Sequence, residues 1–340
     1  MEKLLEVINL ATYFYTDIGV LPAVDGLNFD LTKGEILAIV GESGCGKSVS
    51  SMSIINMVTP PGKIASGEIL YMGENILHKS TEQMRKIRGN EISIIFQDPI
   101  SSLNPVLKIG KQLIETIVSH TKISKAEAKN KAILALGSVG IPDPISFIHK
   151  YPHELSGGMC QRVMIAIAIC CEPNILIADE PTTALDVTIQ AQILRLLKSL
   201  RDERGTSIIL ITHDMGVVAQ MADRVLVMYA GQAVEEAEAG KIFKNPTHPY
   251  TIGLLGSIPR LDDDKKELHS IKGTVPGIGE YPKGCRFAPR CEMKDTECEE
   301  SPPEYIGEYG HYVRCHKANM EGSLSKAKET EQSDGQPALH

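Results

Sequence analysis

The sequence predicts an α/β fold, and three observations support this prediction. Up to about residue 255, short β-rich runs alternate with helical patterns, as in other α/β proteins. The apolar run Ile36–Val40 leads into a glycine-rich loop, and Lys47–Met57 has the pattern of a helix that follows it. A second apolar run, Ile175–Ala178, ends at two carboxylates, Asp179 and Glu180. Strand ends of this kind meet at the ligand-binding edge of α/β sheets, so we expect a site there.

The other elements of this part follow from hydrophobic patterning and capping signals. Strands are predicted at three further runs, which are Ile92–Phe96, Ser207–Ile211 and Arg224–Met228. Helices are predicted at Ile109–His120 and Lys125–Ser138. Ser124 and Glu127 have the spacing of a capping box for the second helix, and Gly140 lies just past its end. We expect the helical block, about residues 101–165, to form a subdomain.

Composition and charge exclude several classes of protein. The chain has 340 residues, of which 42% are hydrophobic, so a sizeable core can form. Its net charge of −8 argues against a nucleic-acid partner bound through overall positive charge. The longest apolar run, Val163–Cys171, is far shorter than the roughly 20 residues that span a bilayer. The N-terminus lacks a signal-peptide pattern, so we expect the eight cysteines to be reduced and any membrane role to require a partner.

The glycine-rich loop has the pattern of a phosphate-binding loop. It consists of Gly41, Glu42, Ser43, Gly44, Cys45, Gly46, Lys47 and Ser48. Its two glycines, lysine and hydroxyl stand at the required offsets, and a strand precedes it and a helix follows it. We expect backbone amides and the helix N-terminus to hold the phosphates of a nucleotide, Lys47 to reach the β- and γ-phosphates, and Ser48 to bind Mg²⁺. The alternative is a glycine turn that only caps a structural helix, and the match to the order of strand, loop and helix argues against it.

Four side chains at strand ends complete the predicted nucleotide site. Asp179 suits Mg²⁺ bound through water, and Glu180 suits the general base that polarises the attacking water. Gln97 follows strand Ile92–Phe96 and can orient water and touch the metal. His213 follows strand Ser207–Ile211 and can contact the γ-phosphate. Either residue alone is more often an ordinary polar residue, but the order of the motifs favours function for both.

A second glycine-rich helix start lies between these motifs. The signature segment, Leu155–Arg162, contains Ser156, Gly157 and Gly158. It offers an anion site that the first nucleotide site does not need. We therefore expect it to serve the nucleotide of another molecule, as in an ATPase that works as a sandwiched dimer.

This order of motifs resembles the ATPase subunits of ABC transporters. The resemblance covers about Leu4 to Arg260 and implies a P-loop NTPase core of ABC ATPase type with an antiparallel β subdomain and a helical subdomain, residues 1–256. It also implies that Ser156, Gly157 and Gly158 of one domain close over the γ-phosphate held by a second domain. Asp186, in the segment Ala184-Leu185-Asp186, corresponds to the D-loop. Phe14, flanked by Tyr13 and Tyr15, corresponds to the aromatic residue that stacks on adenine. The sequence departs from many members at Met159, where they have glutamine.

A narrower resemblance lies near the C-terminus. Asn245–Thr251, Gly273–Gly277 and Gly284–Cys291 are similar to the C-terminal extension of oligopeptide/dipeptide importer ATPases, here residues 257–316. The resemblance implies an ATP hydrolase that powers import of peptides or, in some members, nickel complexes. It implies a paralogous second ATPase subunit, two permeases, an extracytoplasmic binding protein, no nucleic acid, and a peripheral position on the cytoplasmic membrane face. Rival interpretations are a soluble ABC ATPase of translation or DNA repair, and a redox-regulated binding module.

Four cysteines in the extension predict a metal site. Cys285, Cys291, Cys298 and Cys315 are separated by five, six and sixteen residues. Such a segment has little core of its own, so a metal clip would stabilise it. The spacing lacks the Cys-x-x-Cys pairs of common zinc sites and does not match ferredoxin runs. The family resemblance implies a [4Fe–4S] cluster, with zinc as the alternative. The polar residues 317–340 are predicted to be a disordered tail.

Overall fold

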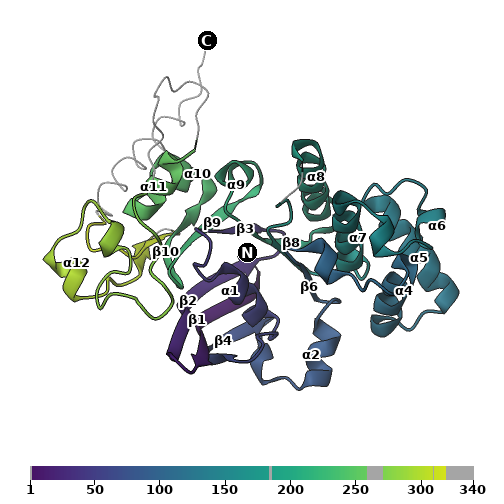
Figure 1. Ribbon diagram of the computed structural model, residues 1–340, viewed down its shortest axis with the longest axis horizontal. Coiled ribbons are helices and arrows are strands. Elements are labelled where there is room, and N and C mark those ends of the chain that lie inside the picture. The colour runs from purple at the N-terminus through teal and green to yellow at the C-terminus, as the bar shows by residue number, and fades with distance from the viewer. Residues whose placement is uncertain (1, 184–185, 259–270, 309, 319–340) are drawn as a thin grey trace, which may run out of the picture.

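In the computed structural model, the chain forms two β-sheets flanked by a helical block and a C-terminal extension (Figure 1). The structure describes residues 2–183, 186–258, 271–308 and 310–318. The predicted tail therefore lies outside the described residues from position 319 onward, as do Ala184 and Leu185. The helical block, α3 to α7, lies at one end of the molecule, and the C-terminal extension lies at the other end.

The main sheet is mixed, and its parallel strands carry the predicted site. Its strand order is β11-β12-β10-β9-β3-β8-β7-β6. The parallel strands are β3 (Ile36–Val40), β6 (Ile92–Ile95), β7 (Ile175–Asp179), β8 (Ser207–Thr212) and β9 (Arg224–Tyr229). Every residue of β3, β7 and β8 is buried, as in strands covered on both faces. The five predicted strands are confirmed to within one residue at their ends.

The start of the chain forms a smaller antiparallel sheet. Its order is β2-β1-β4-β5, with β1 (Lys3–Thr16), β2 (Gly19–Thr32), β4 (Gly62–Tyr71) and β5 (Glu74–Asn75). Its apolar face shares one core with β3 and with α1 (Lys47–Ile54), which ends three residues before the predicted end of this helix. The sheet therefore covers the helix that begins in the glycine-rich loop. This is the mixed α/β architecture expected of an ABC ATPase.

The helical block has its own layer of helices against the sheet. It contains α3 (Pro99–Ser102), α4 (Ile109–His120), α5 (Lys125–Ser138), α6 (Pro144–Phe147), the 3-10 turn η2 (Pro152–Glu154) and α7 (Gly157–Ile169). Both predicted helices have the predicted bounds, and Ser124 and Glu127 form the capping box. Apolar side chains of α4, α5 and α7 share one core with Leu176 and Ala178 of β7. The block is thus packed onto the strand that carries Asp179.

The remaining helices cover the rest of the main sheet. They are η1 (Ile76–His78), α2 (Thr81–Ile87), α8 (Val187–Arg204), α9 (Met215–Met221), α10 (Ala239–Lys244) and α11 (Pro249–Gly256). Within the described ranges, no helix is both long enough and apolar enough to cross a membrane.

The C-terminal extension is built into the main sheet. It contains η3 (Ala288–Arg290), α12 (Thr296–Glu300), β11 (Ile306–Glu308) and β12 (His311–Val313). β12 pairs antiparallel with β10 (Gln232–Glu238), so the sheet continues beyond the ATPase core. Phe287 packs against Tyr229 of β9 and Tyr250 of α11, with ring centroids 5.2 and 5.4 Å apart. The extension therefore shares a core with the ATPase core, which the weak periodicity of its sequence did not reveal.

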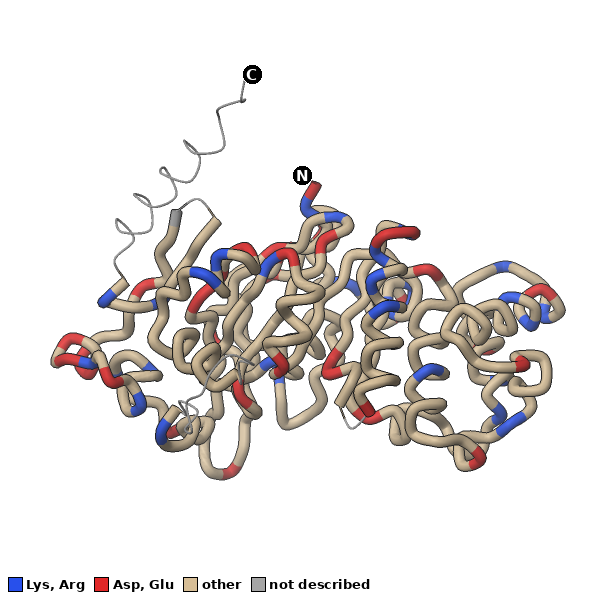
Figure 2. The backbone as a smooth tube through the Cα atoms, turned by 90° about the horizontal axis from the view of Figure 1, so that it is seen from above, with Lys and Arg blue, Asp and Glu red and all other residues tan. Residues whose placement is uncertain are grey.

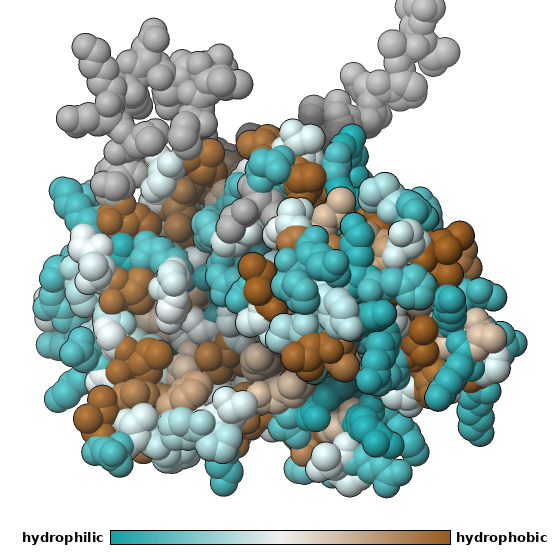
Figure 3. Space-filling view, turned by 45° about the vertical axis from the view of Figure 1, so that its right-hand side comes forward, coloured by the Kyte–Doolittle hydropathy of each residue, from teal (hydrophilic) through white to brown (hydrophobic). Residues whose placement is uncertain are grey.

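Charged and apolar residues are both dispersed over the surface. Figure 2 shows acidic and basic residues interspersed along the chain. On the face drawn in Figure 3, apolar patches are small and separated by polar side chains. The negative net charge is therefore not gathered on one visible face.

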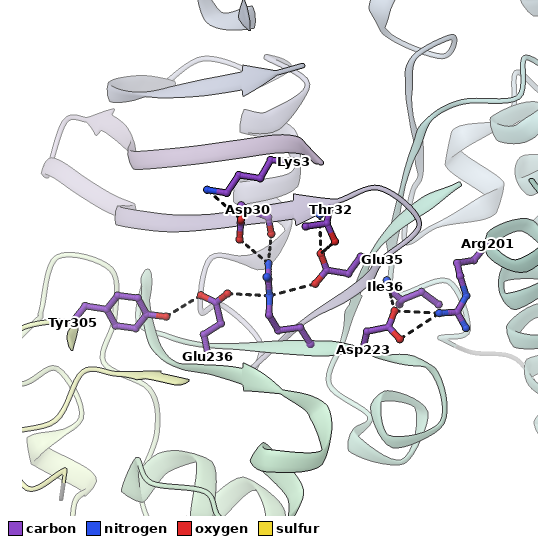
Figure 4. A network of polar contacts seen from close by, with 10 residues as sticks. Lys3, Asp30, Thr32, Glu35, Ile36, Arg201, Asp223, Glu236 and Tyr305 are labelled. Atoms are coloured by element: carbon purple, nitrogen blue, oxygen red, sulfur yellow. Dashed lines mark hydrogen bonds and ion pairs between the residues drawn. The ribbon is translucent and has the colours of Figure 1, made fainter. Parts of the chain in front are cut away.

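One partly buried ionic network joins three parts of the fold (Figure 4). Arg224 of β9 lies 3.0 Å from Asp30 of β2, 3.4 Å from Glu35 and 3.1 Å from Glu236 of β10. The Tyr305 hydroxyl of the extension donates a hydrogen bond of 3.1 Å to Glu236. The network thus links the antiparallel sheet, the main sheet and the C-terminal extension.

Candidate functional site

The glycine-rich loop joins β3 to α1 in a backbone conformation that only glycine adopts easily. Gly41, Gly44 and Gly46 have φ angles of +155°, +80° and +103°. A Cβ atom on Gly41 would lie 2.3 Å from the Met228 carbonyl oxygen. A Cβ atom on Gly46 would lie 2.5 Å from a second backbone oxygen, that of Ala23. Two of the glycines are therefore required by space as well as by conformation.

Lys47 places its charge inside the curve of this loop. Its side chain is buried, and its ammonium group donates hydrogen bonds to the carbonyl oxygens of Gly41 at 2.8 Å and Glu42 at 3.0 Å. Ser43, Gly44 and Ser48 are exposed around it, whereas Cys45 is fully buried. The exposed start of α1 thus combines free backbone amides with a fixed cation, which is the chemistry that binds phosphate.

Asp179, the last residue of β7, has an unpartnered carboxylate oxygen next to this loop. The residue is 6% exposed, and its Oδ1 atom is buried without a hydrogen-bond partner. Burial raises the pKa of Asp179, while the Ser48 hydroxyl and the Lys47 charge oppose this rise. A buried carboxylate oxygen without a partner beside a hydroxyl is an unfavourable arrangement unless a cation completes it. Asp179 and Ser48 therefore fit a Mg²⁺ ion.

Gln97, Glu180 and His213 come together at the ends of three neighbouring strands. The Gln97 amide donates a hydrogen bond of 2.9 Å to Glu180 Oε2. His213 Nδ1 lies 3.2 Å from Glu180 Oε1. The Thr183 hydroxyl also donates to Oε2, at 2.9 Å, and sequence reasoning missed this contact. The spacing of Thr183, three residues after Glu180 in a strand-to-helix turn, was the only available signal.

The backbone and the charge of Glu180 are both held in an unusual state. Its φ angle is +47°, a left-handed conformation that costs about 1–3 kcal/mol in a non-glycine residue. Burial raises the pKa of its carboxyl, but the hydrogen bonds from Thr183 and His213 outweigh burial and leave the pKa lowered. The carboxylate is therefore ionised at neutral pH and surrounded by groups that fix its direction. An ionised, oriented carboxylate can accept a proton from water.

The signature segment forms a separate helix start. Ser156 caps α7, and its hydroxyl accepts a hydrogen bond of 3.4 Å from the Met159 amide. Ser156 and Gly157 are exposed, and a Cβ atom on Gly157 would meet nothing within 4 Å. Both segments are fully described, and no hydrogen bond or ion pair joins residues 155–158 to residues 41–48. The signature segment is thus an open helix N-terminus that does not complete the nucleotide site of its own chain.

The remaining predicted nucleotide contacts lie on β1 and before α8. Phe14 is half-buried beside Gly62, whereas the hydroxyl of Tyr13, on the opposite face of the strand, donates a 2.9 Å hydrogen bond to Asp25. Asp186 caps α8, where its side chain accepts a 2.9 Å hydrogen bond from the Ile189 amide. Ala184 and Leu185, which precede it, lie outside the described residues.

The four cysteines of the extension line one pocket. Cys285, Cys291, Cys298 and Cys315 are all free thiols, and the pocket they share also contains Phe287 and Met293. Burial raises the pKa of Cys285, Cys291 and Cys315, and neighbouring cysteines add to the rise. However, no group of three or more His, Cys, Asp or Glu side chains in the described part of the chain is arranged to hold a metal ion. The described residues therefore do not contain the expected metal site in a preformed arrangement.

Two matches to protein families cover the two predicted parts of the chain, besides a third match, at residues 150–219, to the family described as AAA domain, putative AbiEii toxin, Type IV TA system. Residues 24–183 match the family described as ABC transporter. Residues 234–298 match the family described as oligopeptide/dipeptide transporter, C-terminal region. The first match contains the glycine-rich loop, the signature segment and the acidic strand end, and the second contains three of the four cysteines.

Curated relatives are similar over nearly the full length. The chain is 50% identical to the oligopeptide transport ATP-binding protein AppD of Bacillus subtilis (strain 168), over 95% of this chain and 99% of that protein. It is 52% identical to the dipeptide transport ATP-binding protein DppD of the same organism, over 93% and 95% of the two chains. It is also 52% identical to the oligopeptide transport ATP-binding protein OppD, over 92% and 88%.

Solved structures share the ATPase core. The ATP-binding cassette MJ0796, solved as a dimer in a post-hydrolysis state bound to ADP and phosphate, is 27% identical, with a TM-score of 0.63. The match covers 69% of this chain and 98% of that chain. The cbiO1 subunit of the ABC transporter complex cbiONQ from Clostridium perfringens is 29% identical, with a TM-score of 0.61, over 72% and 92%.

Proposed function

This chain belongs to the family of ATP-binding subunits of oligopeptide and dipeptide ABC transporters, and on that premise we propose that it hydrolyses ATP to power peptide import. The observation that carries the proposal is identity of 50–52% to peptide transport ATP-binding proteins over more than nine tenths of the chain. The match extends through the C-terminal region and is thus not limited to the general ATPase core. We propose that the chain divides into an ATPase domain at 1–256, an extension at 257–316 and a tail at 317–340.

In the proposed mechanism, the glycine-rich loop binds the phosphates of ATP. The amides of Gly41–Ser48 and the Lys47 ammonium stabilise their negative charge. Ser48 and Asp179 would hold Mg²⁺, and Gln97 lies at the same edge of the sheet. When bound, the ion neutralises charge that develops on the phosphates.

Glu180 is the proposed general base for the attacking water. Its carboxylate accepts hydrogen bonds from Gln97 and Thr183 and lies 3.2 Å from His213, so its orientation is fixed before substrate binds. Gln97 would orient the water, and His213 would contact the γ-phosphate. This pre-organisation lowers the cost of reaching the transition state.

The signature segment would act on a second subunit. Ser156, Gly157 and Gly158 form an exposed helix N-terminus, which suits the γ-phosphate of ATP bound to a partner. We propose a head-to-tail dimer with a paralogous ATPase subunit, with Asp186 near the shared surface and Phe14 against adenine. The isolated chain should then hydrolyse ATP slowly, because half of each composite site comes from the partner.

The proposed machine also needs membrane partners. Ile100 and Val106 follow Gln97 by three and nine residues in the sequence, and they are 65% and 76% exposed. These apolar side chains suit cytoplasmic helices of two permease subunits, to which ATP-driven closure would be transmitted. We propose that the chain is peripheral on the cytoplasmic face of the membrane and that an extracytoplasmic binding protein delivers substrate.

Uptake in a deletion strain tests the proposed substrate. The gene is deleted, and uptake of a labelled dipeptide, a labelled longer peptide and nickel is measured, with complementation by wild type or Lys47→Ala. Loss of peptide uptake that only wild type restores supports the proposal. If only nickel uptake falls, the substrate is a metal complex. If complementation changes none of the three, a soluble ABC ATPase without a transport role becomes the better account.

A second proposal concerns the cysteines. We propose that Cys285, Cys291, Cys298 and Cys315 hold a [4Fe–4S] cluster, supported by the single pocket that all four line. When bound, such a cluster would cross-link the extension through four thiolates. Protein purified without oxygen should contain iron and acid-labile sulfide in equal amounts. One equivalent of zinc without iron would favour the zinc alternative, and the absence of any metal would refute both.

A further inference from the structure

An arginine of the C-terminal extension reaches the glycine-rich loop. Arg290, at the end of η3, forms a bidentate pair with the Glu42 carboxylate: Nη1 donates to Oε2 at 2.8 Å and Nη2 donates to Oε1 at 3.1 Å. The Arg290 side chain is only 5% exposed, whereas that of Glu42 is 28% exposed. The two residues are 248 positions apart in the sequence. A bidentate, largely dehydrated arginine–carboxylate pair fixes both distance and orientation.

Glu42 is held at its backbone as well. Its amide donates a 2.8 Å hydrogen bond to the hydroxyl of Tyr250, which is fully buried in α11. Its carbonyl oxygen accepts a 3.0 Å hydrogen bond from Lys47. The second residue of the loop is thus anchored from outside the loop by Tyr250 of α11 and Arg290 of the extension, and from inside by the lysine.

Arg290 makes several contacts besides the one with Glu42. Its Nε atom donates to the Lys272 carbonyl oxygen at 3.0 Å, and Nη2 lies 3.3 Å from the Gly273 carbonyl oxygen. Its guanidinium lies over the ring of Tyr229, 5.8 Å from the centroid. These contacts fix the guanidinium, so Glu42 meets a rigid partner.

We propose that Arg290 is a positioning residue for nucleotide binding, acting through Glu42 to hold the glycine-rich loop in its binding conformation. Three glycines with positive φ make this loop flexible, and ordering it on binding would cost conformational entropy. A fixed anchor at Glu42 removes part of that cost before ATP arrives. Arg290 makes no contact with Gln97, Glu180 or His213, all of which are described, so the chemical step should be spared. The inference rests on the proposed role of the loop in binding ATP.

Equilibrium ATP binding by the full-length chain and steady-state kinetics of the assembled transporter test this. Arg290→Ala and Glu42→Gln should each raise the Kd and KM for MgATP roughly tenfold, which corresponds to about 1.4 kcal/mol. In Arg290→Ala, kcat should stay within about twofold of wild type, because Arg290 lies outside the loop. Arg290→Lys should have a Kd for MgATP between those of wild type and Arg290→Ala, because one ammonium cannot make a bidentate pair. The Arg290→Ala, Glu42→Gln double variant should be no worse than the weaker-binding single variant, because both remove the same interaction.

Arg314→Ala is the matched control. Arg314 is a partly buried arginine of the same extension and also precedes a cysteine, but it donates to the Ala233 and Pro303 carbonyl oxygens and not to the loop. The ATP affinity of the Arg314→Ala variant should equal that of wild type. Additive losses in the double variant, unchanged ATP affinity in Glu42→Gln, or an equal loss in Arg314→Ala would overturn the inference. Lys47→Ala distinguishes failure of the proposed nucleotide site from failure of the proposed role of Arg290. If Lys47→Ala binds ATP normally, the proposed nucleotide site itself is wrong.

Discussion

Glu180→Gln should stop ATP turnover while leaving ATP binding intact. The substitution keeps the length and shape of the side chain. If its carbonyl oxygen takes the place of Oε2, it still accepts the 2.9 Å hydrogen bonds from Gln97 and Thr183. What is lost is the negative charge that would accept a proton from water. General base catalysis contributes about 10²–10⁴-fold, so kcat should fall by that factor, which is about 2.7–5.4 kcal/mol of barrier.

The assay is turnover in an assembled complex whose other nucleotide site is disabled, together with equilibrium ATP binding. Affinity should stay within about threefold of wild type, because Lys47 and the loop are untouched. Glu91→Gln is the matched control: Glu91 Oε2 also accepts two hydrogen bonds, from Tyr71 at 3.0 Å and Asn174 at 2.8 Å, but it precedes β6 at the other end of that strand. Turnover by Glu180→Gln within about threefold of wild type at equal ATP occupancy would refute the role of Glu180 as the base.

Three further predictions concern the loop, the metal ligand and the ionic network. Gly46→Ala should lower the unfolding temperature and weaken ATP binding at least tenfold, because φ is +103° and the new Cβ would lie 2.5 Å from the Ala23 carbonyl oxygen. Gly44→Ala is the control: φ is +80° and the space around it is open, so it should lose only about 1–2 kcal/mol of stability through left-handed backbone strain. Asp179→Asn should raise the Mg²⁺ concentration needed for turnover at least tenfold yet stabilise the nucleotide-free protein in thermal melts, since it removes a buried charge with an unpartnered oxygen. Burial raises the pKa of Glu236 to about 7 against the opposing charge of Arg224. The contribution of Glu236 to stability is therefore full below its ordinary pKa of 4.5 and is lost as the pH rises through about 7. Thermal melts at a series of pH values should show this loss in wild type and not in Glu236→Gln.

Local patterns predicted the α/β core well because its elements are short and strongly patterned. The helices Ile109–His120 and Lys125–Ser138 were predicted to the residue, since apolar spacing defines both and a capping box marks the start of the second. The long strands β1 and β2 were not predicted residue by residue. Their pairing with each other contains four register shifts, so alternation along each strand is broken. Such irregular strands have little periodic signal for a single sequence to reveal.

The candidate site was predictable to the extent that it follows from strand ends. Gln97, Glu180 and His213 come from three runs that each end at the same edge of the sheet, and the structure brings all three within hydrogen-bonding range. Thr183 was not predicted because its contact depends on the left-handed backbone of Glu180, which turns the chain back toward its own carboxylate. Glutamate seldom adopts this backbone conformation, so only the three-residue spacing between Glu180 and Thr183 could have suggested the contact.

The contact between Arg290 and Glu42 could not have come from sequence, because no local rule joins residues so far apart. The sheet makes the contact possible: β10 lies between β12 and β9, and β9 lies beside β3. The extension therefore joins the sheet on the side where β3 leads into the loop. Phe287 then packs on Tyr229 and Tyr250, and the turn that follows it points Arg290 at the loop. The extension shares a core with β9, β10 and α11, so its packing contributes to the stability of the fold. Arg290, whose side chain is only 5% exposed, would in addition position a loop that must be mobile enough to admit ATP and ordered enough to hold it.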